Sequence, residues 1–174
     1  MTKKGKYHQG QFMLSEEQKS HYIGNPNTIY YRSSWEKRLM IFLSNNRKIE
    51  EWNSEGVVIE YINPFDKRPH KYVMDFYFKT KDGKKYLVEV KPYKQAIEPR
   101  ETLTPTGRRS KKRFETYRNE MNLYFVNKAK WKAAKAFCDK NDVTFLICTD
   151  DPEKSEKYSL IFKLFTLQEL GIDV

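Results

Sequence analysis

One β-hairpin constrains this chain more than any other feature of its sequence. Residues 71–79 and 85–91 have the composition of two strands, and the residues between them, around Asp82-Gly83, have the composition of a turn. The loop can contain two residues or three, and the two choices differ in register by one residue. Because side chains alternate between the faces of a strand, this difference decides which of them share a face.

The distribution of apolar side chains favours the longer loop. A two-residue loop, Asp82-Gly83, sets Asp75 opposite Val90 and mixes polar and apolar residues on each face. A three-residue loop, with Gly83 in the left-handed conformation, sets Asp75 opposite Glu89. It also collects the apolar pairs on one face: Met74 with Val90, Phe76 with Val88, and Phe78 with Tyr86. We therefore expect the three-residue loop, with the two acids on the other face.

Two acids placed in this way have a specific chemical use. Directly opposite residues have Cβ atoms about 5 Å apart, and two carboxylates that close repel each other unless a cation lies between them. Mg²⁺ takes few protein carboxylates and fills its other positions with water or phosphate oxygens. Lys91 follows Glu89 on the same face, where its charge can stabilise a phosphate. Carboxylates on a strand are more often simply solvated, so the pattern becomes specific only in combination with other features.

Glu36 is a third acidic candidate, on a predicted helix that begins at residues 33–36. The buried stripe of this helix consists of Trp35, Leu39, Phe42 and Leu43. Ser33-x-x-Glu36 has the pattern of a capping box, in which the glutamate serves only to cap the helix. Glu36 also borders the buried stripe, from where it can reach the edge of the sheet. Both interpretations remain open.

The charge and cysteine content narrow the class of protein. The chain has 33 Lys and Arg against 23 Asp and Glu, a net charge of +10, which attracts nucleic acid or an anionic membrane surface. No apolar run approaches the roughly 20 residues of a membrane-spanning helix, and the N-terminus has no apolar signal-peptide stretch. Cys138 and Cys148 form no CxxC pair. We expect an intracellular protein that does not insert into a membrane.

The remaining pattern predicts one α/β domain. Residues 1–32 form an irregular N-terminal arm, and residues 33–174 form the domain, with a basic flexible loop at about 93–112. We expect the element order α, β, β, β, α, β. The strands are expected at 56–63, 71–79, 85–91 and 143–148, and helical stretches at 33–45, 114–125 and 127–140. The long helical connection before the last strand predicts a parallel pairing in a mixed sheet.

The basic loop is the expected contact surface for a polyanion. Its candidates are Arg108, Arg109, Lys111, Lys112 and Arg113. Flexible basic segments neutralise phosphates without reading sequence. Trp131 and the aromatic residues between Phe114 and Phe125 are expected in the core.

These motifs resemble the PD-(D/E)xK nuclease superfamily. Met74-Asp75-Phe76 stands where that superfamily often has Pro-Asp, and Val88-Glu89-Val90-Lys91-Pro92 resembles its second motif. Within it the chain is similar to TnsA-type transposon endonucleases, and more closely to the head completion nucleases of T-even-type tailed phages. Further similar segments are Tyr7-x-x-Gly10-x-Phe12, residues 29–36, residues 70–76 and residues 127–131. The resemblance implies a restriction-endonuclease-like αβββαβ core and a Mg²⁺-dependent DNA endonuclease, in which Mn²⁺ can substitute.

The resemblance also implies roles for single residues. Glu36, Asp75, Glu89 and Lys91 would be catalytic. Asp75, Glu89 and the backbone carbonyl of Val90 would bind the metal, with Glu36 as a further candidate. Arg32 and Ser34 would contact DNA.

The biological setting follows from the same resemblance. The enzyme would act on DNA after packaging, in the host cytoplasm during phage assembly, with portal, head or neck proteins as partners and with possible retention in the virion. Two alternatives stay open at this point. One is a non-catalytic head completion protein that binds DNA ends or the portal, and the other is the TnsA-like endonuclease subunit of a transposase.

Overall fold

A five-stranded mixed sheet forms the centre of the molecule. The structure is a computed structural model that describes residues 9–103, 106–108, 110–150 and 162–173. The sheet has the order β3 (Ile49–Ser54), β6 (Phe76–Thr80), β7 (Lys85–Val90), β8 (Thr144–Asp150) and β9 (Phe162–Phe165). Only β7 and β8 are parallel neighbours. This arrangement confirms the expected α/β fold class and the expected parallel pairing.

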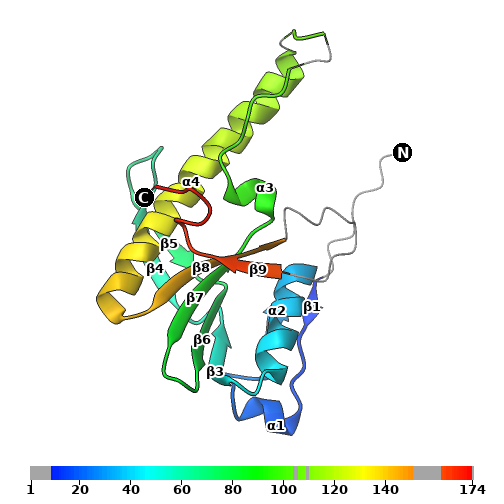
Figure 1. Cartoon of the computed structure of the whole chain (residues 1–174), viewed down its shortest axis with the longest axis vertical. Coiled ribbons are helices and arrows are strands. Elements are labelled where there is room, and N and C mark those ends of the chain that lie inside the picture. The colour runs from blue at the N-terminus through cyan, green and yellow to red at the C-terminus, as the bar shows by residue number, and fades with distance from the viewer. Residues whose placement is uncertain (1–8, 104–105, 109, 151–161, 174) are drawn as a thin grey trace.

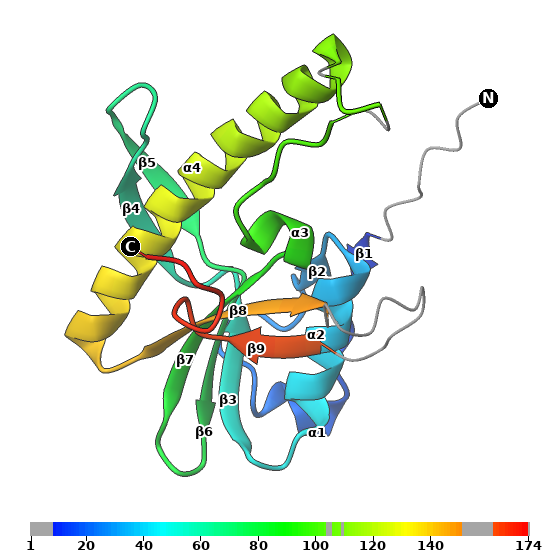
Figure 2. The same cartoon turned by 45° about the horizontal axis from the view of Figure 1, so that its top comes forward.

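Two helices cover the opposite faces of this sheet, as Figures 1 and 2 show. The first is α2 (Ser34–Asn45) and the second is α4 (Lys111–Asn141). Neighbouring residues of β7 divide between the two cores. Val88 lies in the same buried cluster as Leu39 of α2, whereas Leu87 lies in the cluster of Trp131 on α4. Every second residue of the central strands is therefore committed to one helix, which is why these strands are apolar on both faces.

The predicted strands at 56–63 and 71–79 are corrected by the structure. β4 (Val58–Ile62) pairs with β5 (Pro69–Val73) in a separate two-stranded sheet beside α4 (Figure 2). The expected strand 71–79 is two strands, β5 and β6, with a break at Met74-Asp75. The Met74 amide donates to the Val57 carbonyl, and the Asp75 carbonyl accepts from the Glu55 amide. The chain changes pairing partners at this point and passes from one sheet into the other.

Strand β3 was missing from the sequence prediction. Its buried residues Ile49 and Trp52 are three positions apart, which breaks the alternation that marks a strand. A bulge between Ile49 and Glu51, where the register with β6 shifts, brings both side chains to one face. With β3 in the sheet and the β4–β5 hairpin set aside, the order α2, β3, β6, β7, α4, β8 matches the expected αβββαβ core.

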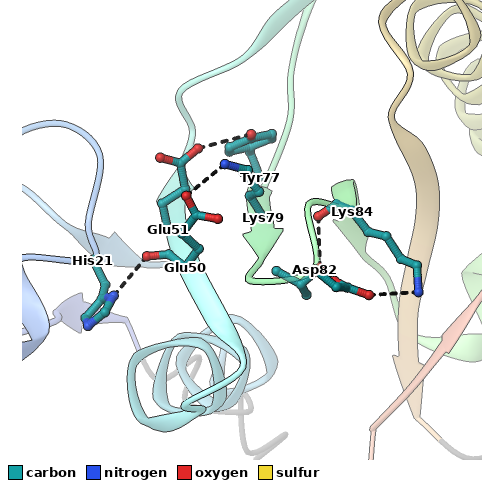
Figure 3. Close-up of polar contacts among 8 residues, drawn as sticks. His21, Glu50, Glu51, Tyr77, Lys79, Asp82 and Lys84 are labelled. Carbon is teal, nitrogen blue, oxygen red and sulfur yellow. Dashed lines mark hydrogen bonds and ion pairs between the residues drawn. The ribbon is translucent and has the colours of Figure 1, made fainter.

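The register of the β6–β7 hairpin agrees with the three-residue loop. Phe76 pairs with Val88 and Phe78 with Tyr86. Gly83 has a φ of +88°, and its amide donates to the Thr80 carbonyl. Asp82 accepts from the Thr80 hydroxyl and forms an ion pair of 2.9 Å with Lys84 (Figure 3). These contacts close the loop with the glycine in the left-handed position. This is the three-residue loop that the distribution of apolar side chains predicted.

The predicted pair of helices at 114–125 and 127–140 is one continuous helix, α4, of 31 residues. Asn127, at the expected interruption, is buried within it. Trp131 and Tyr124 lie in the core, but Phe114 and Phe125 are more than 40% exposed. The expectation that the whole aromatic stripe is core is therefore wrong for Phe114 and Phe125. The N-terminal part of α4 extends beyond the sheet in Figures 1 and 2.

The described part of the N-terminal arm, residues 9–32, packs on the side of α2. It contains β1 (Gly10–Gln11), α1 (Glu16–Lys19) and β2 (Tyr30–Tyr31). Phe12, Leu14 and Ile29 are buried in the cluster that contains α2. On the other side of the sheet, α3 (Tyr93–Ala96) directly follows β7. Within the described part of the chain, no helix has the length and apolarity needed to cross a membrane.

Candidate active site

The hairpin places Asp75 and Glu89 at the end of β7 where the chain leaves the sheet. Phe76 and Val88 form the last observed pair of this hairpin, and Asp75 and Glu89 are the next residues beyond that pair. Asp75 is half-buried, and its Oδ2 accepts a hydrogen bond of 2.7 Å from the Val90 amide. Glu89 is only 2% exposed. Two acidic side chains with little access to water therefore lie side by side.

Lys91 supplies the positive charge of this site. Its Nζ lies 2.7 Å from Oε1 of Glu89. Burial alone would lower the pKa of Lys91, but the charges of Glu89, Asp75 and Glu36 outweigh burial and raise it. The ammonium group therefore keeps its proton at neutral pH. One fixed cation faces at least two carboxylates, so the site is short of positive charge.

That shortage of positive charge affects the pKa of Asp75. Burial, and then the neighbouring Glu89 carboxylate, raise the pKa of Asp75 well above its ordinary value of 3.8. Lys91 and the Val90 amide act in the opposite direction, and Glu36 adds to the increase. The raised pKa follows from placing like charges in a region of low polarity. A further cation would relieve the repulsion directly.

Glu36 lies near the pair but is held by its own helix. Its Oε1 accepts from the Ser33 hydroxyl at 2.8 Å, and its Oε2 accepts from the Arg32 amide at 2.8 Å. The Ser33 hydroxyl in turn accepts from the Glu36 amide. This is a capping arrangement at the start of α2. The influence of Glu36 on the pKa of Asp75 shows that the cap and the site are within electrostatic range.

The donor set fits a hard divalent cation of the Mg²⁺ type. Asp75 and Glu89 provide carboxylate oxygens, and Oε2 of Glu89 is buried without a hydrogen-bond partner among the described residues. The Val90 carbonyl follows Glu89 directly in sequence. Among the described residues, no group of three acidic, His or Cys side chains forms a metal cage. Mg²⁺ needs no such cage, because it retains water and takes phosphate oxygens as ligands.

The sequence-predicted DNA contacts lie at two places. Arg32 is exposed and forms an ion pair of 2.8 Å with Glu55, and Ser34 is half-buried in the first turn of α2. Lys111, Lys112 and Arg113 begin α4 and are exposed, and Arg113 also donates to the Leu103 carbonyl. Arg108 is exposed in the preceding loop, whereas Arg109 lies outside the described residues. Apart from Arg109, the second group lines the segment that joins α3 to α4.

Two residues near the acids were missed by the sequence analysis. Tyr72 is buried beside Glu89, and the charges of both acids contribute to raising the pKa of its hydroxyl after burial itself. Cys148 pairs with Val90 across β7 and β8, and burial followed by the charge of Asp75 raises its pKa to about 12. A buried thiol of that kind is unreactive. Neither residue stands out in sequence, because an aromatic or Cys residue in a strand is usually core.

Comparison with known proteins identifies the family of this chain. The family described as "TnsA-like endonuclease N terminal" matches residues 46–150, which is more than half of the chain. The chain belongs to the TnsA-like endonuclease family. Among curated proteins, this TnsA-like chain is similar to the head completion nuclease of Enterobacteria phage T4, with 37% identity over 132 residues. That alignment covers 76% of this chain and 85% of the phage protein. No solved structure matches the chain.

The TnsA-like match contains most of the site. Asp75, Glu89 and Lys91 all lie inside the matched range, together with β3, the β6–β7 hairpin and α4. Glu36 lies ten residues before the range begins. The family match therefore covers the hairpin and its three charged residues and leaves the helix cap outside.

Proposed function

We propose that this TnsA-like protein is a metal-dependent DNA endonuclease of the PD-(D/E)xK type that acts in the completion of phage heads. The observation that carries the proposal is the Asp75 carboxylate held by the Val90 amide beside the buried Glu89, with Lys91 bound to the second acid. Mg²⁺ is the proposed cation, and Mn²⁺ the proposed substitute. Family membership and the similarity to a phage head completion nuclease support the same reaction class.

Each group at the site has a proposed task in hydrolysis. Asp75, Glu89 and the Val90 carbonyl would hold the cation. The chemistry that Mg²⁺ would supply there is polarisation of a phosphate oxygen and a lowered pKa of a coordinated water. Lys91 keeps Glu89 oriented and presents a protonated amine to the charge that develops on the phosphate. Glu36 fixes the start of α2 and adds negative charge near the cation.

The DNA path is proposed to run from the site along the segment before α4. Arg108, Arg109, Lys111, Lys112 and Arg113 would neutralise phosphates on one side. Arg32 and Ser34, at the start of α2, would contact the backbone on the other side. Such contacts give affinity without sequence preference, which suits an enzyme that acts on packaged DNA of any sequence.

The proposed setting is the cytoplasm of the infected cell during head assembly. The relative in phage T4 is named for head completion, and most of its length aligns with this chain. Portal, head or neck proteins are the proposed partners. Residues 33–174 are proposed as the nuclease domain, with residues 1–32 as the arm that packs against it.

A cleavage assay tests the enzymatic part of this proposal. Linear and supercoiled DNA are incubated with the protein and Mg²⁺ or Mn²⁺, and the parent is compared with Asp75→Ala and Lys91→Ala. We expect nicking or cutting by the parent that stops in EDTA, and at least a hundredfold slower cutting by each variant, as is typical when a group that stabilises transition-state charge is removed.

The matched control is Lys79→Ala. Lys79 forms an ion pair of 2.8 Å with Glu50 at the β3 edge of the sheet (Figure 3), and its side chain is 27% exposed, against 25% for Lys91. This control should cut DNA at the parental rate. Cutting by the Asp75 and Lys91 variants at the parental rate would remove the nuclease proposal and favour a non-catalytic protein that binds DNA ends. Activity that required an added transposase would instead favour the transposon role.

A further inference from the structure

Two buried polar atoms at the site lack hydrogen-bond partners among the described residues. They are the hydroxyl of Tyr72 and Oε2 of Glu89, and the two residues are only 3% and 2% exposed. Buried hydroxyl and carboxylate groups are nearly always hydrogen-bonded in native proteins, because an unpaired polar atom in the interior lowers stability. An unpaired donor and an unpaired acceptor in one place therefore indicate a functional arrangement.

The two groups lie on the same side of the sheet. Glu89 shares a face of β7 with Leu87, which lies in the same buried cluster as Tyr72. Tyr72 also precedes Asp75 by three residues, and the Asp75 carboxylate accepts from the amide of Val90, the residue after Glu89. A tyrosine phenol is protonated at neutral pH. A protonated phenol can donate a hydrogen bond, and an ionised carboxylate can only accept one.

The ring of Tyr72 is fixed from two other sides. Tyr61 packs against it edge to face, with ring centroids 6.4 Å apart. Lys130 of α4 places its Nζ 5.3 Å from the centre of the Tyr72 ring and 5.7 Å from that of Tyr61. An ammonium group over an aromatic ring is attracted to the electron density of its face. These contacts restrict the movement of the ring and therefore of its hydroxyl.

We propose that Tyr72 is a positioning residue for Glu89. Its hydroxyl is the donor available to Oε2, while Lys91 holds Oε1 at 2.7 Å. The carboxylate is then oriented by a donor at each oxygen before a cation binds. Groups that orient metal-binding side chains in this way contribute strongly to metal affinity. This inference rests on the proposed function, because it gives Tyr72 a role toward a proposed metal ligand.

The test compares two variants that each lose one hydroxyl group. Tyr72→Phe keeps the ring and its contacts, and Tyr61→Phe makes the same chemical change in the neighbouring ring of the same cluster. Mn²⁺ binding to the full chain is measured by calorimetric titration. We expect Tyr72→Phe to bind Mn²⁺ about tenfold more weakly than the parent, and Tyr61→Phe to bind it as the parent does.

Cleavage kinetics provide a second readout that a purely structural role would leave unchanged. For Tyr72→Phe, the Mn²⁺ concentration for half-maximal rate should rise about tenfold, whereas kcat at saturating Mn²⁺ should approach the parental value. Parental Mn²⁺ affinity in Tyr72→Phe, or equal weakening in both variants, would overturn the positioning role and leave the nuclease proposal intact. A parent protein that binds no Mn²⁺ would instead overturn the proposed function and this inference together.

Discussion

At the scale of single residues, the site contains more negative charge than its one lysine compensates. Asp75 and Glu89 repel each other in a region with little water, and Lys91 compensates for only part of that repulsion. The protein therefore keeps a less favourable arrangement at this point than an apolar strand pair would give it. Such local costs are common at functional sites, where the ligand removes them.

Replacing Asp75 by Asn should therefore stabilise the metal-free protein while removing the proposed metal-dependent cutting. Because the pKa of Asp75 is raised in the folded state, its ionised form costs stability above the ordinary pKa of 3.8. In EDTA at pH 7 we expect the melting temperature of Asp75→Asn to rise by about 2 °C or more. The gain should shrink as the pH falls and disappear well below 3.8, where the carboxyl is protonated in both the folded and the unfolded state.

Asp82→Asn is the control, for which we expect the melting temperature to change in the opposite direction. The Thr80 hydroxyl and Lys84 lower the pKa of Asp82 to about 2, so its ionised form favours the fold. Its removal should lower the melting temperature slightly at pH 7, because an exposed group is well screened. A melting temperature of Asp75→Asn equal to or below that of the parent in EDTA would show that the acidic pair is not strained.

At the scale of elements, the β6–β7 hairpin was predictable and its neighbours were not. Its register followed from burial, because only one alignment puts Phe76, Phe78 and Val88 on one face. The alternation of apolar and polar residues does not show which strand is the pairing partner. The sequence therefore predicted one strand at 71–79, where the chain passes from β5 to β6 at Asp75. In β3, the bulge removed the alternation itself.

The candidate site was predictable to the same extent. Asp75, Glu89 and Lys91 follow from the hairpin register alone. Tyr72 lies in β5, on a different sheet, and reaches Glu89 only through packing between elements. Local sequence patterns carry no information on such a contact.

Gly83→Ala should test how strongly the loop fixes the hairpin. At Gly83 a Cβ meets no atom within 4 Å, so the cost arises only from the φ of +88°. We expect a loss of about 1 kcal/mol in the free energy of unfolding, measured by urea titration. Gly83→Asn should lose less, because Asn adopts this conformation more readily. Equal stability of parent and Ala variant would mean that the left-handed turn is not maintained in solution.

At the scale of the whole molecule, a small acidic site lies in a strongly basic chain. The net charge of +10 attracts DNA from a distance, and the acidic pair repels phosphate unless a cation is bound. The N-terminal half of α4 extends away from the sheet (Figure 1) and carries Lys111, Lys112 and Arg113 at its start. The proposed function thus assigns DNA binding and DNA cutting to different parts of the molecule.

The salt dependence of DNA binding should reveal this division. With Lys111→Gln and Lys112→Gln combined, the slope of log affinity against log salt should become shallower by about 0.9 for each phosphate that the variant no longer neutralises. The control changes two exposed lysines in the C-terminal half of the same helix, Lys132 and Lys140, to Gln. Binding is measured by fluorescence anisotropy in EDTA. An equal change of slope in both double variants would indicate a diffuse effect of net charge.

The passage of the chain between the two sheets has a mechanical consequence. Val73 ends the small β4–β5 hairpin, and Asp75 follows after a single intervening residue. A displacement of this hairpin would also displace the backbone of Asp75, because only one residue separates them. The position of the outer hairpin and the position of Asp75 are therefore coupled through the backbone.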